Sequence, residues 1–482
     1  MSKQTRRDFL KTAAAAGAAF PLFTIAGTKA SGLVLGANET IRVAVVGING
    51  RGSSHIDELA GRPGVQVTYL VDPDSRVFPS RIKQVEKKGG NTPKCVQDLR
   101  VALEDKDLDA ISVATCNHWH SLSTIWACQA GKDVYVEKPI SHNVFEGRQC
   151  VEAMRKYKRV VQHGTQQRSD GGRARQMAAI HSGKYGKLLV SKGYCCKPRW
   201  SIGTKAVTDP PKDFDFNLWL GPASEQPFHS NLHPYNWHWF WAFGNGDVGN
   251  QGVHEMDVAR WGIQGATLPT KIWALGGRFL PDGKDQGETP NMQLSVMEFG
   301  ETLLVFETRG LVAKEGAPPF KVGNEFYTTE GLIKDGKFYP NKGGDPEPVK
   351  GGEEAKVTPG GAFGSFIAAV RSRKPEDINC DAEVGHYSAA LCHLGNISYR
   401  LGQPVPFNKQ TKALGDNKQV VESFEMIREN LQAVNIKLDD ATYQLGPTLT
   451  FDPQAEKFVN NDAANALLTR KYRAPFVVPV KV

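Results

Sequence analysis

The stretch "VVGINGRGSSH", from Val45 to His55, decides how the first part of this chain is interpreted. It completes a β-branched run, "IRVAVVG" (Ile41 to Gly47), which is typical of a buried parallel strand. Gly47, Asn49 and Gly52 occupy the slots of the pattern G-x-G-x-x-G, with an asparagine in place of the usual middle glycine. A strand, a glycine-rich loop and the start of a helix in this order predict a dinucleotide-binding turn.

Each residue of the loop has an expected task. Gly47 permits a tight turn, and Gly52 permits close packing of the helix on the strand. The helix N-terminus at Gly50 and Arg51 directs free N–H groups and a favourable dipole at a pyrophosphate. Asn49 is tolerated because asparagine adopts positive φ more readily than most residues.

A carboxylate stands at the expected distance from this loop. Asp72 ends a second apolar run, "VQVTYLVD", twenty residues after Gly52. It is expected to accept hydrogen bonds from ribose hydroxyls and to repel a 2′-phosphate, which favours NAD over NADP. Arg76 lies close by and weakens that preference, so NADP stays open. The alternative is an ordinary strand–turn–helix that holds no cofactor.

Length and composition restrict the class of protein. A chain of 482 residues is too long for one ordinary core, so two domains are expected. Hydrophobic content of 40% and charged content of 23% are typical of a soluble globular protein. The net charge of +8 is modest and the basic residues are scattered, so no nucleic-acid partner is predicted. No internal stretch is long and apolar enough to span a bilayer.

The N-terminus has the pattern of a targeting segment. "TRRDFLK" (Thr5 to Lys11) precedes an Ala-rich, mildly apolar run, and small residues near Ala30 suit a cleavage site. Residues 1–30 are therefore predicted to be a twin-arginine signal peptide, with the mature protein periplasmic or otherwise extracytoplasmic and not inserted in a membrane. A basic, Ala-rich helix at the start of a cytosolic enzyme is the alternative.

The order of elements predicts an α/β fold in two parts. Strand-like runs alternate with helical stretches through residues 39–166, which predicts a doubly wound parallel sheet of the Rossmann type. From residue 167 to 482 strand-like runs such as "NMQLSVMEF" and "TLLVFETRG" follow one another with turns between them. This texture predicts an antiparallel sheet and hence an α+β second domain.

Three further stretches carry a family resemblance over nearly the whole chain after the signal. They are "VATCNHWHSLSTIWACQAGKDVYVEKPISHN", "FNLWLGP" and "GNQGVHEMDVARW". Together with the glycine loop they resemble the glucose–fructose oxidoreductase, inositol dehydrogenase and rhizopine-catabolism (Gfo/Idh/MocA) family. The resemblance implies a Rossmann domain and a C-terminal domain with a large, mostly antiparallel open sheet for substrate binding and oligomerisation. It also implies NAD(P)-linked chemistry on a sugar or cyclitol, without fixing the substrate.

Glu137-Lys138-Pro139 ends a predicted parallel strand, at the carboxyl edge where ligands bind in open α/β sheets. By resemblance Lys138 is the catalytic lysine, and a buried lysine can donate to a hydroxyl and carry a proton. The alternative is a surface lysine at a strand end. The resemblance also implies roles for other residues on this edge. His118 is expected to bind the substrate, and the cofactor-binding residues near the nicotinamide and its ribose are Thr115, Asn117, His120 and Glu137. No metal is predicted, because His118 and His120 have no evident third ligand.

Asn250, His254 and Asp257 have the spacing i, i+4, i+7, which places them on one face of a helix. The family pattern has an aspartate that orients the histidine, and here Asn250 stands in its place. His254 remains the candidate acid/base, Asp247 is a candidate substitute for the missing aspartate, and Asp257 is assigned to the substrate. Alternatively, Asn250 caps the helix and the others form its polar face.

An aromatic stretch, "NLHPYNWHWFWAFGNGD", supplies side chains suited to sugars. Tyr235, Trp237 and Trp239 are predicted to line the substrate site, although a core strand with alternating large residues explains them as well. Gln167 and Arg168 stand where the family enters its second domain and are also expected to border the substrate.

These observations predict an exported NAD(P)-dependent oxidoreductase that acts on a secondary alcohol of a sugar, sugar derivative or cyclitol, with a tightly bound nicotinamide cofactor. One alternative is a redox-neutral glycoside hydrolase or lyase that uses transient oxidation by bound NAD. Another is a non-catalytic protein that binds cofactor and sugar. A homo-oligomer is expected if the open sheet pairs with a second copy.

Overall fold

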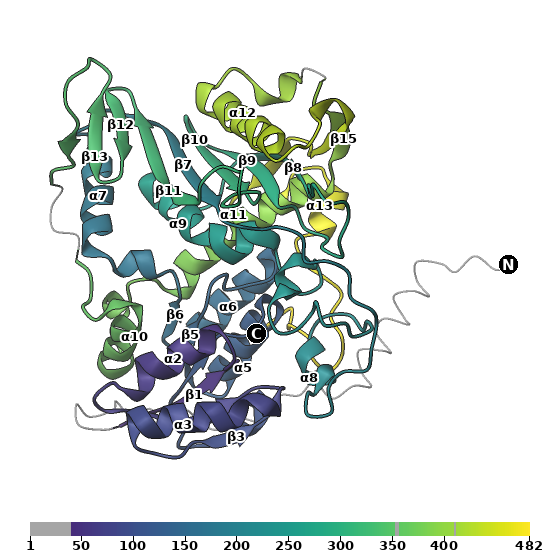
Figure 1. The fold of residues 1–482 in the computed structure, drawn as a ribbon. Coiled ribbons are helices and arrows are strands. Elements are labelled where there is room, and N and C mark those ends of the chain that lie inside the picture. The colour runs from purple at the N-terminus through teal and green to yellow at the C-terminus, as the bar shows by residue number, and fades with distance from the viewer. Residues whose placement is uncertain (1–39, 352–355, 409–410) are drawn as a thin grey trace, which may run out of the picture.

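The computed structural model describes residues 40–351, 356–408 and 411–482 (Figure 1). The predicted signal peptide lies outside these residues. None of the helices in the described ranges is long and apolar enough to cross a membrane.

The first domain is built on a six-stranded parallel sheet, as the sequence predicts. The strand order is β3-β2-β1-β4-β5-β6, with the reversal between β1 and β4 that defines a doubly wound sheet. The short β3 pairs with β2 and was not anticipated, because its three residues are not fully buried and lack an apolar pattern. The strands are β1 (Ile41–Val46), β2 (Val65–Val71), β3 (Lys94–Val96), β4 (Ala110–Val113), β5 (Asp133–Val136) and β6 (Val161–His163).

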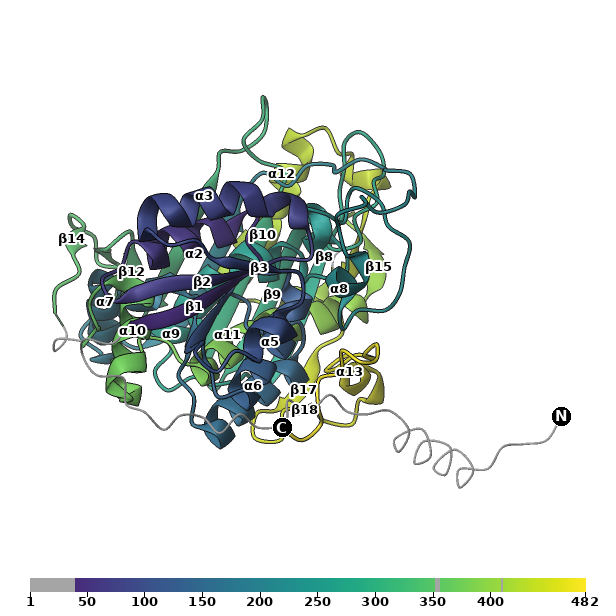
Figure 2. The ribbon, with the colours of Figure 1, turned by 90° about the horizontal axis from the view of Figure 1, so that it is seen from below.

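Helices cover both faces of this sheet (Figure 2). α2 and α3 lie on one face, and α5 and α6 lie on the other, where their apolar residues form a core with the strands. Asn143 caps α6 through its side chain, which accepts a hydrogen bond from the Glu146 N–H. The helices are α2 (Arg51–Ala60), α3 (Phe78–Gly89), α4 (Leu99–Leu103), α5 (Asn117–Gln129) and α6 (Val144–Tyr157).

The second domain contains a large sheet that is antiparallel except where β7 and β10 run parallel, which confirms the predicted fold class. Its main path is β14-β13-β12-β11-β7-β10-β9-β8-β16-β15, and β17 and β18 extend it from β8. The strands are β7 (Leu188–Cys196), β8 (Lys271–Gly277), β9 (Met292–Phe299), β10 (Thr302–Arg309), β11 (Lys321–Thr328), β12 (Gly331–Lys334), β13 (Lys337–Pro340), β14 (Glu347–Pro348), β15 (Gln403–Pro406), β16 (Thr442–Leu445), β17 (Leu449–Asp452) and β18 (Lys457–Phe458).

Helices α9 and α11 pack against the face of this sheet that is turned toward the first domain, and α12 packs against the other face (Figure 1). Two further segments pack on the first domain: α10 buries Phe363 and Phe366 against its core, and the C-terminal tail inserts Phe476 beside α5. The helices are α7 (Gly171–His181), α8 (Phe216–Leu220), α9 (Val253–Gly262), α10 (Gly361–Ser372), α11 (Ala382–Arg400), α12 (Lys418–Ala433) and α13 (Asp462–Ala466).

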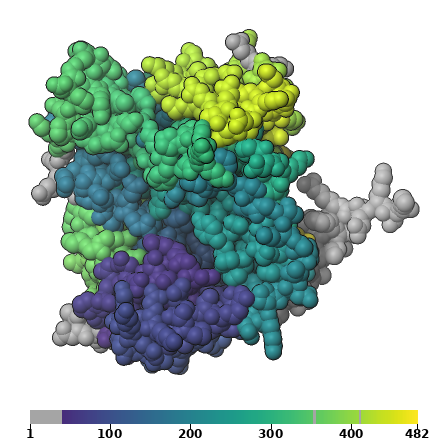
Figure 3. Space-filling view, viewed as in Figure 1, coloured from purple at the N-terminus to yellow at the C-terminus, as the bar shows by residue number. Residues whose placement is uncertain are grey.

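Between β7 and α9 the chain forms a largely irregular segment, which we call the covering segment (residues 202–243). It contains α8 and a 3-10 turn, Asn236–Trp239, and it has an aromatic core of its own. Figure 3 shows this teal part of the surface lying directly against the purple and blue first domain. The predicted alternative of a core strand through the aromatic stretch is therefore wrong.

Candidate functional site

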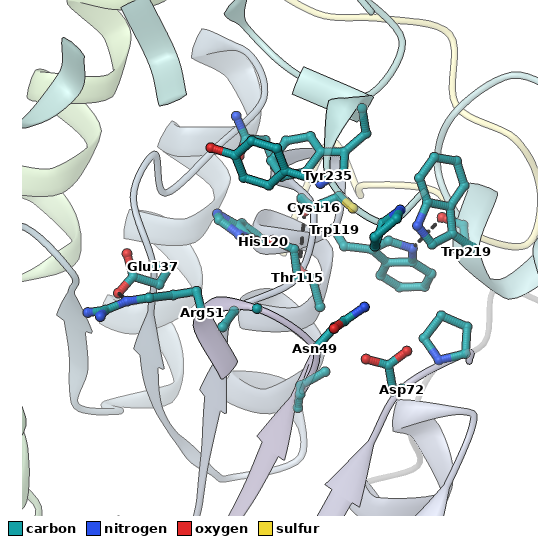
Figure 4. A pocket seen from close by; sticks show the side chains of 18 of the residues that line it. Asn49, Arg51, Asp72, Thr115, Cys116, Trp119, His120, Glu137, Trp219 and Tyr235 are labelled. Carbon is teal, nitrogen blue, oxygen red and sulfur yellow. Dashed lines mark hydrogen bonds and ion pairs between the residues drawn. The ribbon is translucent and has the colours of Figure 1, made fainter. Parts of the chain in front are cut away.

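A cavity of about 340 Å³ opens at the carboxyl ends of β1, β2, β4 and β5, between the first domain and the covering segment. Figure 4 shows Asp72 and Asn49 at one end, Glu137 and Arg51 at the other, and Tyr235, Trp119 and Trp219 above them. Of the residues assigned to the site from sequence, thirteen line this cavity: Gly47, Asn49, Gly50, Arg51, Asp72, Thr115, Asn117, His120, Glu137, Lys138, Tyr235, Trp237 and Asn250.

The glycine loop fits a pyrophosphate. Gly47 has φ +77, and a Cβ there would lie 2.8 Å from the Thr115 backbone. A Cβ on Gly52 would lie 1.8 Å from the Gly47 carbonyl oxygen, whereas a Cβ on Gly50 would meet no atom within 4 Å. Helix α2 has neither a side-chain cap nor an acidic residue in its first turn. Its N-terminus therefore presents N–H groups and a positive dipole to the open space beside Gly50.

The explanation offered for Asn49 is wrong, since its φ is not positive. The loop is instead held from outside by Arg81 of α3, whose guanidinium donates to the carbonyl oxygens of Ile48 at 2.7 Å and of Asn49 at 2.8 Å. Arg81 carries no motif, so the sequence offered no signal for this role.

Asp72 lies at the other end of the loop. Its two oxygens accept hydrogen bonds of 2.9 Å from the N–H groups of Ile48 and Asp74. Burial raises the pKa of Asp72 to about 6, although these two hydrogen bonds oppose that shift. Arg76 forms two 2.7 Å contacts with Asp74, so it is engaged with that carboxylate. Because Arg76 is paired with Asp74, it is less available to bind a 2′-phosphate, which favours NAD over NADP.

Lys138 lies at the end of β5 and lines the cavity. Its ammonium donates to the backbone oxygen of Asn250, and burial lowers its pKa. Glu137 points the other way, toward Arg51 Nε at 2.8 Å and His55 Nε2 at 3.2 Å. Burial alone would raise the pKa of Glu137, but the His55 and Arg51 contacts outweigh it and hold that pKa well below its usual value.

The α5 residues assigned from the resemblance fall into two groups. His120 lines the cavity, and its ring nitrogens lie 2.6 Å from the Pro139 oxygen and 3.0 Å from the Thr115 oxygen. Thr115 and Asn117 also line it. His118 does not. Its Nε2 lies 2.9 Å from the Trp219 oxygen, its ring packs against Trp219 and Phe243, and burial lowers its pKa to about 3. His118 therefore docks the covering segment, and the substrate-binding assignment is corrected.

The helix expected to carry Asn250 and His254 on one face is interrupted. Asn250 lies in a π-helical turn, Val248–Gly252, and α9 begins only at Val253. Asn250 is therefore not a helix cap. π-helical turns within helices occur frequently at functional sites. His254 is not among the residues that line the cavity, and burial, followed by the charge of Lys138, lowers its pKa to about 3.

The acidic residues of this region have other partners. Asp247 accepts a 2.7 Å hydrogen bond from Arg199 Nε and one of 3.5 Å from the Cys195 thiol, so its described contacts do not reach His254. Asp257 is fully buried and pairs with Arg168 at 2.8 Å and with the Ser388 hydroxyl at 2.6 Å. Arg168 and Asp257 thus bind each other rather than the cavity, and Gln167 also lies outside its lining.

The aromatic stretch is divided by burial. Tyr235, 57% exposed, and Trp237 line the cavity, while Trp239 is only 2% exposed within the core of the covering segment. The assignment of Trp239 to the substrate is therefore corrected.

Six further cavity residues were not assigned to the site from sequence: Trp119, Lys197, Arg199, Trp219, His233 and Gln251. Trp119, Trp219, His233 and Gln251 lie within the quoted stretches, whereas Lys197 and Arg199 carry no motif. No group of three or more histidine, cysteine, aspartate or glutamate residues is placed to hold a metal ion in the part of the chain that the structure describes.

This geometry is that of a nucleotide-binding site at the switch point of a Rossmann sheet. Residues 41–165 match the family model "Oxidoreductase family, NAD-binding Rossmann fold", and residues 186–272 match "Oxidoreductase family, C-terminal alpha/beta domain". Both matched regions are therefore similar to the Gfo/Idh/MocA oxidoreductase family, and residues 41–165 are similar to its NAD-binding Rossmann domain.

Individual relatives carry two kinds of name. A "Glycosyl hydrolase family 109 protein" of Shewanella pealeana is 28% identical over 42% of this chain and 48% of its own length. An "Inositol 2-dehydrogenase" of Salmonella paratyphi B is 30% identical over 32% of this chain and 45% of its own. The chain thus spans about half the length of the curated relatives it matches.

A solved levoglucosan dehydrogenase, in complex with NADH and levoglucosan, shares the fold. It superimposes with a TM-score of 0.54 at 16% identity, over 73% of this chain and 95% of its own.

Proposed function

We propose that this chain is an exported, NAD-dependent oxidoreductase that transfers hydride at a secondary alcohol of a sugar, sugar derivative or cyclitol and keeps its cofactor bound. One observation carries the proposal. A single cavity joins the glycine loop and Asp72 to Lys138, and Tyr235 and Trp237 close it from the opposite side. Aromatic faces beside polar groups suit the C–H and hydroxyl surfaces of a sugar ring.

Oxidation of a carbinol removes a hydride and a proton. Bound NAD supplies the hydride acceptor, and the protein must accept the hydroxyl proton. Lys138 is suited to this, because burial lowers its pKa and its Nζ is fixed on the Asn250 carbonyl oxygen. Arg51 and His55 engage the Glu137 carboxylate and so reduce its hold on the lysine proton. His254 is not assigned as the base, since burial lowers its pKa to about 3 and makes it a weak proton acceptor.

The covering segment supports a retained cofactor. It is joined to the end of β2 by backbone hydrogen bonds from Asp215 to Pro73 at 2.8 Å and from Ser75 to Asp213 at 3.0 Å. His233 Nε2 lies 3.0 Å from the Asp74 carboxylate beside these bonds. A nucleotide held against Asp72 would lie beneath this clamp, and its release would require the clamp to open. Such a clamp slows dissociation, which is how most tight binding arises.

The other edge of the covering segment is fastened as well. Trp119 Nε1 donates to the Trp219 oxygen at 3.0 Å, beside the His118 contact to the same oxygen. Arg473, in the C-terminal tail, donates to the side chain and backbone of Asn217 at 2.6 and 2.7 Å. These contacts join three separate parts of the chain across the nucleotide end of the cavity.

A retained nucleotide is consistent with the predicted twin-arginine signal in residues 1–30. The twin-arginine route carries folded proteins, so a cofactor loaded in the cytoplasm travels with the enzyme. Outside the cytoplasm there is no ready pool of NAD, and an enzyme that released NADH would stop after one turnover. We therefore propose that each catalytic cycle restores the bound nucleotide, either by reducing a second sugar or by reversing the first oxidation.

The glycosyl hydrolase relatives favour a second candidate of this closed-cycle type. Oxidation of one carbinol acidifies the neighbouring C–H bond. Loss of that proton then allows elimination of the glycosidic substituent, water adds, and the carbonyl is reduced again by the same cofactor. The outcome is glycoside hydrolysis with no net redox change, unlike the paired-carboxylate route.

The test begins with protein purified and dialysed without added nucleotide. Mass spectrometry of the native protein is expected to show bound NAD, and a panel of sugars and glycosides is then assayed with no cofactor added. Oxidised sugar formed together with a reduced second sugar supports the oxidoreductase, and cleaved glycoside without reduced nucleotide supports the second candidate. An empty site that needs millimolar NAD and releases NADH stoichiometrically overturns retention.

Export is tested separately. A reporter fused behind residues 1–38 is expected to reach the periplasm of a host with the twin-arginine route. Replacing Arg6 and Arg7 together by lysine is expected to abolish this, while Lys3→Arg leaves it unchanged. Export that survives the double replacement contradicts the proposal.

A further inference from the structure

The substrate end of the cavity contains a cationic corner that the proposed chemistry does not use. Lys197 and Arg199 follow the end of β7 and line the same cavity as Lys138. Neither residue belongs to the glycine loop or to the edge that holds the nucleotide. They lie on the second-domain side, with Gln251 and Tyr235 among the neighbouring lining residues.

The two cations differ in how their charge is balanced. Arg199 has a buried counter-ion, because its Nε donates to Asp247 Oδ1 at 2.7 Å and Asp247 is only 1% exposed. Lys197 donates to the neutral amide oxygen of Gln251 at 2.9 Å. Within residues 40–351, 356–408 and 411–482, no carboxylate forms an ion pair with Lys197.

A second buried acid near this corner, Glu255, supplies the missing charge only in part. Glu255 is buried one turn beyond Gln251, and burial raises its pKa to about 7. One of its oxygens has no hydrogen-bond partner. Glu255 is therefore partly protonated at neutral pH and balances Lys197 only in part.

A lysine on an open surface needs no counter-ion, because water solvates it. Lys197 is partly buried, lies 5.8 Å from the centre of the Phe320 ring and faces a cavity that is partly open to solvent. A sugar that fills the cavity displaces water from the ammonium, and an unpaired charge in a dry site is costly. A neutral sugar leaves the desolvated Lys197 ammonium without a counter-ion, whereas a sugar with a negative group supplies one and so avoids the desolvation cost.

We propose that the substrate carries a singly charged acidic group, a carboxylate or a sulfate ester, which Lys197 binds directly with Arg199 beside it. One charge is inferred because Arg199 is already paired with Asp247, whereas Lys197 forms no ion pair among the described residues. Lys138, which also forms no ion pair there, is assigned to the hydroxyl proton. This inference rests on the proposed function, since it names the substrate class of the same cavity. Lys197 is a specificity-determining residue in it and takes no part in proton transfer.

The test measures binding rather than turnover, so that it does not depend on the reaction. Isothermal titration of the cofactor-loaded protein compares methyl glucoside with methyl glucuronide, methyl galactoside with methyl galacturonide, and glucose with glucose 6-sulfate. We expect at least one acid to bind about tenfold or more tightly than its neutral partner, the usual scale of a hydrogen bond to a charged group. The carboxylate and sulfate arms decide which group is recognised.

Variants then test whether Lys197 causes the tighter binding of the acidic sugar. Lys197→Met keeps the length of the side chain and removes its charge, and it is expected to reduce the preference to within about threefold while the affinity for the neutral sugar changes little. Lys197→Arg is expected to retain most of the preference. Lys337→Met, at an exposed lysine of β13, serves as the matched control. Bound nucleotide and melting temperature, measured for each variant, report folding.

Two results overturn the inference: no acid binds more tightly than its neutral partner, or Lys197→Met retains the full preference. Failure of the proposed function has a different signature. In that case the acid preference and its loss in Lys197→Met persist, but no sugar is oxidised or cleaved by the cofactor-loaded protein.

Discussion

The two walls of the cavity are built in opposite ways. The nucleotide wall consists of the ends of four parallel strands, β1, β2, β4 and β5, each followed by a short turn. The substrate wall consists of short pieces from the end of β7, the covering segment and a π-helical turn. Regular strands place their end residues by local rules, whereas the opposite wall depends on contacts between distant parts of the chain. Sequence motifs therefore describe the first wall well and the second poorly.

The largest expected effect contrasts two tryptophans of the covering segment. Trp239 is 2% exposed and stacks with Arg278 at 4.9 Å, so Trp239→Ala should destabilise the protein by about 3–5 kcal/mol. Trp237 lines the cavity, so Trp237→Ala should weaken sugar binding and change the free energy of unfolding by roughly 1 kcal/mol or less. Denaturant unfolding at equal nucleotide saturation, with sugar titration, separates the two. Equal destabilisation by both variants would refute the division of this stretch into core and lining.

The second prediction concerns proton transfer at the junction of the two walls. Lys138→Ala should lower turnover by about 10²-fold or more, the scale of losing a positioned acid/base, while nucleotide binding persists. Lys337→Ala, at an exposed lysine far along the large sheet, is the matched control. Steady-state rates with nucleotide content measured in parallel check this, and turnover near that of the unmodified protein would remove Lys138 from the chemistry.

The third prediction tests the close packing of α2 with two glycines, Gly52 in its first turn and Gly61 just beyond its last residue. Gly52→Ala places a Cβ 1.8 Å from the Gly47 oxygen and should cost of order 1–3 kcal/mol in stability or nucleotide binding. Gly61→Ala, at the other end of α2, places its Cβ 3.6 Å from the Asp57 oxygen in an ordinary contact and should change little. Melting temperature and retained NAD are the measurements. Similar behaviour of the two variants would contradict the close approach at Gly52.

The smallest effect is a pH dependence of nucleotide binding. The pKa of Asp72 is about 6, so the carboxylate is ionised at pH 7 and largely protonated at pH 5. Protonation removes acceptor capacity for ribose hydroxyls, so NAD affinity should fall as pH decreases, by roughly threefold to tenfold between pH 7 and pH 5. Titrations of the nucleotide-free protein check this, with Asp72→Asn as control. Glu255 titrates in the same pH range. If the pH dependence of NAD binding persists in Asp72→Asn, it arises from a group other than Asp72, such as Glu255.

The sequence predicts those residues of the candidate site that lie directly after buried strands, because a strand is recognisable from its local apolar pattern. The strands that precede Gly47, Asp72 and Lys138 are short and apolar, and parallel strands bring their carboxyl ends to one edge. Tertiary contacts removed some of the assigned residues from the site. His118 and His120 lie two positions apart on α5, yet His118 faces the Trp219 oxygen and His120 faces the cavity. The sequence cannot distinguish them, because the segment that covers His118 lies a hundred residues away.

By itself, the sequence determined the doubly wound sheet, the glycine loop, the carboxylate at Asp72 and the lysine at a strand end, because each follows from residues within one strand–turn–helix unit. Only the tertiary structure decided the partners of the charged side chains. In it Arg168 pairs with Asp257, and Arg199 pairs with Asp247. Lys197 instead donates to the neutral side-chain amide of Gln251. The physical reason is that an ion pair depends on distances between atoms of separate elements, and no local period in the chain encodes those distances.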